Sequence, residues 1–491
     1  VTARNLKNDG RWNVLSSQTL TLDGLDGDVA TGLIGEGTFC LETAGPDANA
    51  CNGLAESDSV GATSLTLNQA GDSVFDGTFE GLGTLVKSGE GSLTLTNAQT
   101  FLGGLTVNDG AIFAEHSDSN AGDLFAESLN ITVNAEGRLD LETQDTFGSL
   151  TNFGIVNVNA DQTVVSAQTK GGTTNLDANI TTTGAFVVGD LEGSDGVVNI
   201  NGDHTVTADG GLSGDGDLMI ADDQTFTMSQ KAGTISTFRG NVVSNEDPNT
   251  SRFAFTGGGQ LVLAGSEDQV SVSFLDIVDG RVVLDGNELL NDEIAVDVAE
   301  AGELELRDAP DETSTRQESI DSLGGSGRIY LGRNTLNVEN GGSFEGEFFG
   351  TGTVNVVNGN FTINNSLTSE QGGLTVSNED GTTVAQGTNV DVKTVSVTDR
   401  AQMNVVGVGL GESEISRVTG QTISVESGAR LYTGSGSYSE GSESFSVVEA
   451  TDTIEVSGEF AGNGTLAAPV VNVGAPTGAT RANIRPGDSP G

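Results

Sequence analysis

The chain has 491 residues, a net charge of −50 and a pI of about 4.1. Such an acidic surface repels nucleic acid and anionic lipid, and the sequence contains no run of about 18 apolar residues that could span a bilayer. The simplest interpretation of the charge is that it keeps a long molecule soluble and monomeric, and the alternative is that divalent cations bridge its acidic faces.

The composition favours a chain of many short strands joined by turns. There are 71 Gly but only 7 Pro, and Thr, Val, Asn, Asp and Ser are abundant. Val and Thr favour strands, whereas Gly, Asn and Asp favour turns. Because apolar doublets and triplets recur along the whole chain, we exclude disorder and expect an all-β fold.

Two cysteines, Cys40 and Cys51, lie near the start with ten residues between them. A metal site would need further Cys or His ligands nearby, and the only histidines are His116 and His204. Catalytic redox pairs are usually spaced by two residues. We therefore predict a disulfide that closes one surface loop and indicates an oxidising compartment; two free buried thiols are the alternative.

Short apolar segments follow in chain order, each of three or four residues with Gly, Asn or Asp close by. Strands this short suit a solenoid, in which each coil adds one short strand to each face. Those from which the pattern is read are Leu93–Leu95, Leu105–Val107, Leu139–Leu141, Ile155–Val158, Val197–Ile200, Leu261–Leu263, Val282–Leu284, Leu304–Leu306, Val354–Val356, Val395–Val397 and Ile454–Val456.

The pattern Gly-x-Gly-x-apolar recurs at least six times, and the starts of six copies are separated by multiples of about 22 residues, a period typical of β-solenoids. We interpret it as a sharp turn in which glycine supplies a positive φ and the following apolar residue points into the core. The glycine pairs are Gly35 and Gly37, Gly81 and Gly83, Gly214 and Gly216, Gly325 and Gly327, Gly350 and Gly352, and Gly462 and Gly464.

Two other interpretations of this glycine motif fit the sequence less well. A phosphate-binding loop needs a helix after it, and the residues that follow are strand formers. A calcium-binding repeat carries acidic residues in every copy, whereas most copies here carry Leu, Ser, Thr or Asn where Gly214–Asp217 has two Asp. We therefore expect no cofactor, with weak Ca²⁺ binding at this single position as the alternative.

These patterns predict a right-handed parallel β-helix (a β-solenoid) with about 20 coils. We expect residues 1–60 to form N-terminal coils with the disulfide loop, and residues 61–491 to form one continuous β-helix. The segments Cys40–Cys51, Ser244–Arg252, Arg307–Asp321 and Thr433–Ser444 read as loops, either tolerated insertions or adhesive loops on a rigid scaffold.

Residues 81–114 follow the pattern G-x-G-x-L-x-K-x-G-x-G-x-L-x-L, continued by an aromatic residue, Gly-Gly and Val, with Lys87, Phe101 and Gly103–Gly104 in place. This segment resembles the passenger-associated transport repeat of bacterial autotransporters. The C-terminal Pro486-Gly487-Asp488-Ser489-Pro490-Gly491 resembles a segment that precedes the last coils and the outer-membrane barrel in that family. The resemblance implies a passenger truncated before its translocator barrel.

The resemblance to self-associating adhesins implies a secreted protein at the bacterial cell surface, anchored at the outer membrane through the barrel or released. The implied partners are a second copy on a neighbouring cell, a host or abiotic surface, and the translocator barrel, with neither nucleic acid nor a small-molecule substrate. A β-helical stalk that displays an upstream protease or esterase is the alternative function.

No catalytic constellation is evident in the sequence. Gly71-Asp72-Ser73-Val74 resembles the opening of one esterase class, but it leads directly into the transport repeat, and both histidines lie in repeat-like sequence. A polysaccharide lyase would need basic catalytic residues on one face, and the chain has few lysines. We therefore predict an adhesin without catalysis that acts in aggregation and biofilm formation.

Overall fold

The computed structural model describes residues 1–14, 16–23, 32–41, 63–116, 122–190, 196–244, 250–311, 313–363, 367–376, 382–386, 389–398, 401–406, 416–426, 429–433, 446–462, 465–473 and 483–486. They belong to two compact units, unit 1 (Val1–Ser251) and unit 2 (Arg252–Gly491). Their regular elements are β-strands, and no helix among the described residues is long and apolar enough to cross a membrane.

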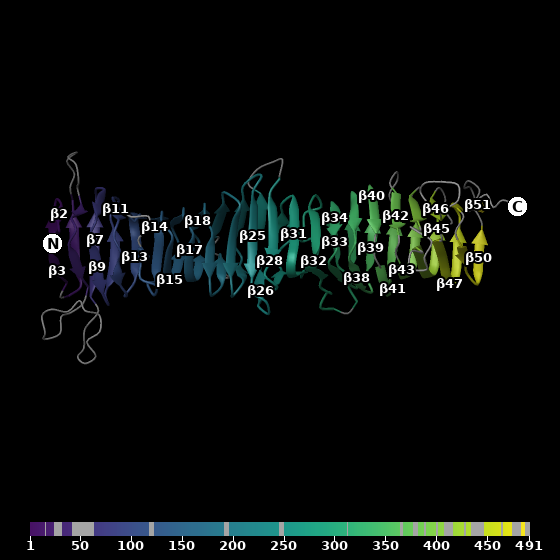
Figure 1. The fold of residues 1–491 in the computed structure, drawn as a ribbon, viewed down its shortest axis with the longest axis horizontal. Helices are drawn as coiled ribbons and strands as arrows, with labels where there is room; N and C mark the ends of the chain where they lie inside the picture. The colour runs from purple at the N-terminus through teal and green to yellow at the C-terminus, as the bar shows by residue number, and fades with distance from the viewer. Residues whose placement is uncertain are drawn as a thin grey trace. The chain divides into compact units, whose positions relative to one another are not determined.

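The strands of unit 1 run from β1 to β27 and are coloured purple to teal in Figure 1. They are β1 (Thr2–Ala3), β2 (Leu6–Lys7), β3 (Arg11–Asn13), β4 (Gln18–Leu22), β5 (Leu33–Ile34), β6 (Thr38–Cys40), β7 (Ser64–Gln69), β8 (Ser73–Phe75), β9 (Thr78–Gly81), β10 (Thr84–Ser88), β11 (Ser92–Leu95), β12 (Thr100–Phe101), β13 (Leu105–Ala114), β14 (Ile131–Leu141), β15 (Asp145–Asn152), β16 (Ile155–Val158), β17 (Gln162–Thr169), β18 (Thr173–Leu176), β19 (Ile180–Thr182), β20 (Phe186–Val188), β21 (Val197–Ile200), β22 (His204–Ala208), β23 (Leu212–Gly214), β24 (Asp217–Ile220), β25 (Thr225–Gln230), β26 (Ile235–Phe238) and β27 (Asn241–Ser244).

Unit 2 continues the numbering from teal to yellow in Figure 1. Its strands are β28 (Arg252–Thr256), β29 (Gln260–Leu263), β30 (Val270–Ser271), β31 (Phe274–Leu284), β32 (Ala295–Leu306), β33 (Gln317–Ile320), β34 (Ser322–Gly325), β35 (Arg328–Gly332), β36 (Thr335–Val338), β37 (Gly341–Phe344), β38 (Glu347–Gly350), β39 (Thr353–Val356), β40 (Asn360–Ile363), β41 (Leu367–Val376), β42 (Thr382–Gln386), β43 (Asn389–Val397), β44 (Gln402–Val406), β45 (Ser416–Val425), β46 (Arg430–Thr433), β47 (Ser446–Val456), β48 (Glu459–Gly462), β49 (Thr465–Ala467), β50 (Val470–Val473) and β51 (Asn483–Pro486).

Within each unit, strands stack in parallel on the strands of the preceding coil, as Figure 1 shows. In unit 1, β10 pairs with β7, β11 with β8 and β12 with β9, and Leu85 stands opposite Leu65 of the preceding coil. In unit 2, β36, β37 and β38 pair in the same way with β33, β34 and β35. A parallel pair needs a long connection between its strands, and here the connection is the rest of the coil. The prediction of an all-β, solenoid-like parallel fold is confirmed at this level.

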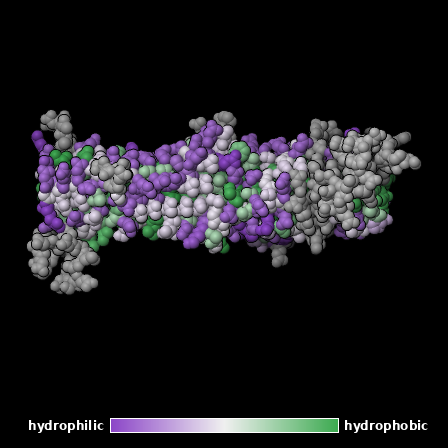
Figure 2. All heavy atoms as spheres, viewed as in Figure 1, coloured by the Kyte–Doolittle hydropathy of each residue, from purple (hydrophilic) through white to green (hydrophobic). Residues whose placement is uncertain are grey.

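The core lies inside the coils, where alternate residues of each strand point. In β10, Leu85 and Lys87 are buried, whereas the intervening Val86 is only half-buried. Phenylalanines on successive coils stack within this core, with ring centroids 5.3 Å apart for Phe39 and Phe79. On the face visible in Figure 2, hydrophilic residues predominate over the described surface.

The interval between coils varies more than the sequence period suggests. Asp145 pairs with Gln162, whereas Asp109 pairs with Glu136, so the second interval along the chain is clearly longer than the first. The expected period of about 22 residues is therefore an average, because turns between strands gain and lose residues without disturbing the paired positions.

Several strands are much longer than the three or four residues expected. The first half of β13 pairs with β10 and its second half with β11, so one strand of 10 residues serves two faces. Its pairing with β14 shifts register between Val107 and Asp109. The expectation of uniformly short strands is wrong here because a bulge bends the strand around the corner without ending it.

Candidate functional site

The first glycine of the repeated pair has a positive φ at each of five copies, as the motif predicts. The values are +106° at Gly35, +101° at Gly81, +114° at Gly214, +97° at Gly325 and +113° at Gly350. In the sixth copy, Gly462 ends β48, and Gly464 lies outside the described residues. These glycines therefore allow a backbone conformation that other residues rarely adopt.

The second glycine of each described pair does not have a positive φ. The prediction that glycine supplies a positive φ is therefore wrong at this position. Instead, a Cβ at this position would collide with a carbonyl oxygen of an adjacent coil. The distance from such a Cβ to that oxygen is 2.3 Å at Gly37, 2.1 Å at Gly83, 2.2 Å at Gly216, 2.3 Å at Gly327 and 2.1 Å at Gly352. Glycine is needed there for close approach of two coils.

The apolar residue after the pair points into the core in five copies, as predicted, whereas Leu466 of the sixth copy is only half-buried. Phe39, Leu85, Leu218, Ile329 and Val354 are all buried. The repeated motif is thus a structural corner, and its role is to shape the backbone.

Cys40 ends β6, is only 2% exposed and is disulfide-bonded. Cys51, its predicted partner, lies outside the described residues, so the pairing stays a prediction.

Residues of both chemical motifs noted in the sequence make structural hydrogen bonds, although Oδ1 of Asp215 is buried without a hydrogen-bond partner among the described residues. Ser73 accepts a hydrogen bond at Oγ from the Nε2 of Gln69 at 2.7 Å, and Asp72 accepts hydrogen bonds from the backbone and hydroxyl of Ser92, each at 2.8 Å. These bonds from Ser92 lower the pKa of Asp72. Asp217 accepts a hydrogen bond from Asn241 at 2.8 Å. The described residues contain no cluster of three His, Cys, Asp or Glu side chains that could hold a metal ion.

Lys87 of the transport-repeat pattern is fully buried. Its Nζ donates to the carbonyl oxygens of Ser88, Gly89 and Asp109 at 3.1, 2.7 and 3.2 Å. Burial lowers the pKa of Lys87 to about 8. Because these acceptors belong to two successive coils, the ammonium group joins the coils at a corner.

Basic side chains concentrate in one part of unit 2. Six arginines lie between residues 252 and 333, namely Arg252, Arg281, Arg307, Arg316, Arg328 and Arg333. The same stretch carries 17 Asp and Glu, so it differs from the rest of the chain in its density of opposite charges and not in its net charge, and it is the candidate functional site.

Four of the charged residues form a row that we call the charged ladder: Arg281 on β31, Glu303 on β32, Arg328 on β35 and Glu347 on β38. Each stands directly opposite the next in the parallel register. Nε of Arg281 donates to Oε2 of Glu303 at 2.7 Å. Nη1 of Arg328 lies 3.3 Å from Oε1 of Glu303, and Nε of Arg328 lies 3.9 Å from Oε2 of Glu347. Charge therefore alternates from coil to coil along this face.

A second row lies beside the charged ladder. Glu305, Tyr330 and Phe349 stand opposite one another on the same strands. The guanidinium of Arg281 lies 4.8 Å from the ring centroid of Tyr330, and its Nη1 lies 2.9 Å from Oε2 of Glu305. Tyr330 stacks on Phe349 with centroids 5.0 Å apart, so both faces of the Tyr330 ring are covered.

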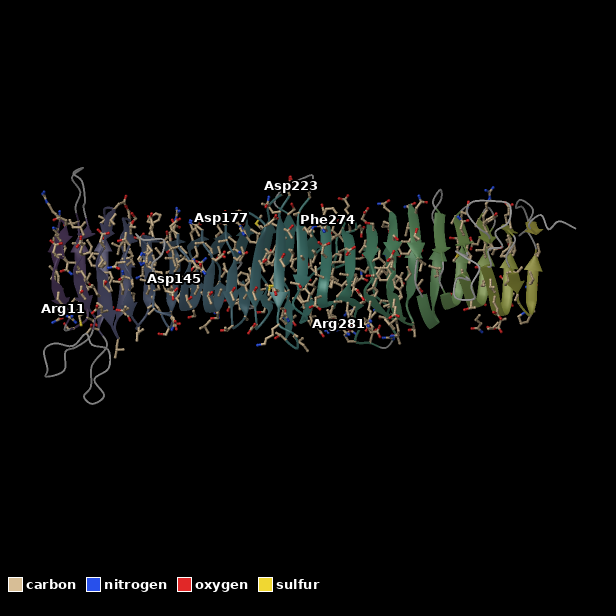
Figure 3. All side chains as sticks on the ribbon, viewed as in Figure 1. Arg11, Asp145, Asp177, Asp223, Phe274 and Arg281 are labelled. Atoms are coloured by element: carbon tan, nitrogen blue, oxygen red, sulfur yellow. The ribbon has the colours of Figure 1, made fainter. Side chains whose placement is uncertain are left out.

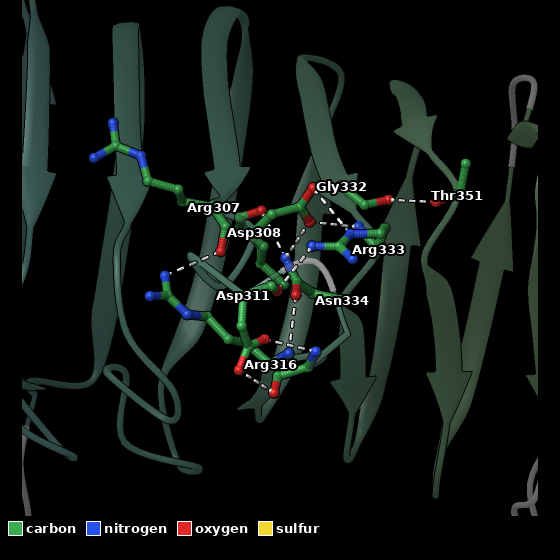
Figure 4. Close-up of polar contacts among 10 residues, drawn as sticks. Arg307, Asp308, Asp311, Arg316, Gly332, Arg333, Asn334 and Thr351 are labelled. Atoms are coloured by element: carbon green, nitrogen blue, oxygen red, sulfur yellow. Dashed lines mark hydrogen bonds and ion pairs between the residues drawn. The ribbon is translucent and has the colours of Figure 1, made fainter.

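Just after the C-terminal ends of β31 and β32, a network of polar contacts holds the segment before β33 (Figure 4). Arg307 and Arg316 each donate from Nη1 to Asp285 at 2.9 Å. Although burial raises it, these two arginines hold the pKa of Asp285 below its usual range. The backbone N–H of Arg316 donates to Oδ1 of Asn334 at 2.9 Å. Four residues of the predicted loop, Gln317–Ile320, are in fact the strand β33.

A hollow of about 550 Å³ lies over the N-terminal halves of β31 and β32 and over β34 and β37. Phe274 lies toward the opposite end of β31 from Arg281 (Figure 3). The guanidinium carbon of Arg252 lies 4.3 Å from the ring centroid of Phe274. Arg252 is also paired with Asp276. Burial and the neighbouring Asp276 raise the pKa of Asp297, although Arg252 partly opposes them. This hollow could accept a cationic group.

The charged ladder was missed in the sequence. Its signal is a charged residue placed just before an apolar one, as in Arg281-Val282, Glu303-Leu304 and Arg328-Ile329. The four charges are unequally spaced along the chain, so only the register of the strands brings their side chains into one row.

The chain matches no protein-family model, no curated protein and no solved structure.

Proposed function

We propose that the chain is the passenger of a bacterial autotransporter and acts as a self-associating adhesin without catalysis. The proposal includes a right-handed winding of the coils, about 20 in number, since connections between parallel strands of one sheet are almost always right-handed. It also includes secretion to the cell surface, as the transport-repeat pattern around Lys87 implies.

The observation that carries the adhesive function is the charged ladder. Its four members alternate in sign, and successive strands of the stack are about 4.8 Å apart. If a second copy lies antiparallel across this face, each Arg faces a Glu, because Arg281 meets Glu347 and Glu303 meets Arg328. In a parallel, in-register arrangement, like charges would meet. The ladder is thus self-complementary under a two-fold axis.

Each ladder contact is weak. An ion pair between exposed side chains contributes about 0–1 kcal/mol, and the ladder residues are from 21% to 52% exposed. Many copies on two facing cells, however, add such contacts by multivalency. This arrangement produces adhesion between cells that is strong in sum and reversible for each pair of molecules.

The test displays the chain on non-aggregating cells and follows settling. One variant, Arg281→Glu with Arg328→Glu, makes the ladder entirely acidic; the other, Glu303→Arg with Glu347→Arg, makes it entirely basic. We expect parent cells to settle, cells of either variant alone to stay suspended, and a mixture of the two variants to settle together. Lys231→Glu, which reverses an exposed charge of unit 1, is the control and should settle like the parent.

Two results would contradict the proposal at different levels. If parent cells neither settle nor attach to a surface at any ionic strength, the adhesive function is wrong. If they settle and both ladder variants alone settle equally well, the ladder is not the contact. Circular dichroism of the purified variants separates loss of contact from loss of folding.

A further inference from the structure

A second hollow of unit 2, of about 430 Å³, lies over β44, β46 and β48. Its volume is within the range of about 300–1,000 Å³ that is usual for small-ligand sites. Inward residues of these strands, such as Met403, Leu431 and Phe460, are buried in the core. The outward positions between them carry the side chains that line the hollow, namely Gln402, Arg430, Tyr432, Glu459 and Ala461.

Tyr432 is an exposed aromatic side chain with no aromatic neighbour on the adjacent strands, because Asn404 stands opposite it on the preceding strand. It is 39% exposed, and the residue opposite it on the next strand is Ala461, whose side chain is a single methyl group. Among the described residues no ring or cation lies over it, and its hydroxyl makes no hydrogen bond. Tyr330, by contrast, is covered by Arg281 on one side and Phe349 on the other.

Polar groups surround this ring. Nε of Arg430 lies 3.2 Å from Oε2 of Glu459, and Nε2 of Gln402 donates to Oδ1 of Asn404 at 2.9 Å. The remaining N–H groups of Arg430, the Oε1 of Gln402 and the Nδ2 of Asn404 form no hydrogen bond within the described part of the chain. The hollow therefore offers both donors and acceptors beside an aromatic face.

We propose that this hollow binds an uncharged saccharide. The negative face of the Tyr432 ring attracts the C–H groups of a sugar ring, while the surrounding amides and the guanidinium pair with its hydroxyls. The opposite charges of Arg430 and Glu459 offset each other, so the site itself favours a neutral ligand. The net charge of −50 disfavours sulfated or uronic acid-containing glycans.

The test measures binding of the purified chain to neutral, acidic and amino-bearing oligosaccharides by glycan array, followed by calorimetry with the bound neutral ones. We expect neutral glycans to bind, and at least a tenfold loss of affinity in Tyr432→Ala. Ala461→Leu should cause a similar loss, because the larger side chain fills the hollow while leaving Tyr432 in place. Tyr330→Ala, which removes a covered ring elsewhere, should bind like the parent.

Failure to bind any neutral glycan, a preference for acidic or amino-bearing glycans, or unchanged affinity in both Tyr432→Ala and Ala461→Leu would overturn the proposal. The two ladder variants should retain saccharide binding. This site is therefore tested independently of self-association.

Discussion

Glu318, on β33 of unit 2, has a carboxyl side chain that is only 1% exposed. Its Oε2 and Oε1 accept hydrogen bonds from the backbone N–H groups of Leu289 and Leu290 at 3.1 and 2.6 Å. Burial raises the pKa of Glu318 to about 8, although the two N–H groups oppose this. Asp145 of unit 1, labelled in Figure 3, holds Phe125 in a similar way, and burial raises its pKa to about 7. Both groups are protonated in the folded state at a pH where the unfolded chain has released the proton.

We predict that the free energy of unfolding falls as the pH rises from about 4.5 to about 8, in part through Glu318. In this window the folded state binds more protons than the unfolded state, so raising the pH favours unfolding. Glu318→Gln cannot ionise, and its stability relative to the parent should therefore improve by a few kcal/mol between pH 5 and pH 8, since one pKa unit corresponds to about 1.4 kcal/mol.

Urea denaturation at pH 5 and pH 8 measures this difference. The exposed Glu293→Gln is the matched control, because it removes the same charge without a buried site. If the free energies of unfolding of Glu318→Gln and Glu293→Gln, each relative to the parent, change with pH to the same extent, the carboxyl of Glu318 does not cause the pH dependence.

Corners between strands depend on contacts that a single methyl group would disrupt. Gly83 lies in the turn between β9 and β10, and a Cβ there would be 2.1 Å from the carbonyl oxygen of Thr63 and 2.2 Å from that of Leu41. Both atoms are backbone, so relief requires movement of an adjacent coil. We predict that Gly83→Ala lowers the free energy of unfolding by about 3 kcal/mol or more.

Thermal and urea denaturation of unit 1 variants test this. Gly122→Ala is the control, since nothing lies within 4 Å of a Cβ at that position, and it should change stability by less than about 0.5 kcal/mol. Equal stability of the two variants would show that the coils can separate at this corner at little cost.

Strands are also joined by rows of amides. The Nδ2 of Asn175 donates to Oδ1 of Asn157 at 2.7 Å, and the Nδ2 of Asn199 donates to Oδ1 of Asn175 at 2.7 Å. The row begins at Asp140, which accepts from Asn157 and from Arg138. Such a row joins four coils through side chains, in addition to the backbone ladder.

Much of the strand content was predictable from local pattern. The apolar segments Ile155–Val158 and Val197–Ile200 are β16 and β21 with the expected bounds, because an alternating apolar run bounded by turn residues has one stable arrangement on a stacked coil. The positions of the corner glycines were predictable from the sequence. The predicted cause, a positive φ, holds only for the first glycine of each described pair. Close approach between coils depends on residues distant in sequence, such as Thr63 for Gly83.

The candidate sites could not be predicted in the same way. The charged ladder and the hollow beside Tyr432 exist only once the register is known, and the register depends on turns of unequal length. Arg430 and Glu459, for example, are opposite each other although the whole of β47 lies between them in the chain. No fixed period would have paired them.

At the scale of the whole molecule, net charge and local pairing act in opposite directions. The chain carries a net charge of −50, which repels a second copy at a distance. The ladder contains two Arg and two Glu, so its own net charge is zero. At 0.01 M salt the Debye length is about 30 Å, so the repulsion between whole chains prevails. At 0.15 M it is about 8 Å, which screens distant charges but leaves side chains in contact, and at 1 M it is about 3 Å, which weakens the contacts as well.

We therefore predict that settling of cells displaying the chain passes through a maximum as NaCl rises from 0.01 to 1 M. The rate should be low at both extremes and highest near physiological ionic strength. A chelator of divalent cations should leave the curve unchanged, because the ladder supplies its own cations. Loss of settling in chelator would instead assign the contact to bridging metal ions, and a rate that increases steadily up to 1 M would assign it to apolar surface. The acidic-ladder variant is the internal control: it should show no maximum at any salt concentration, since every facing pair in it is repulsive.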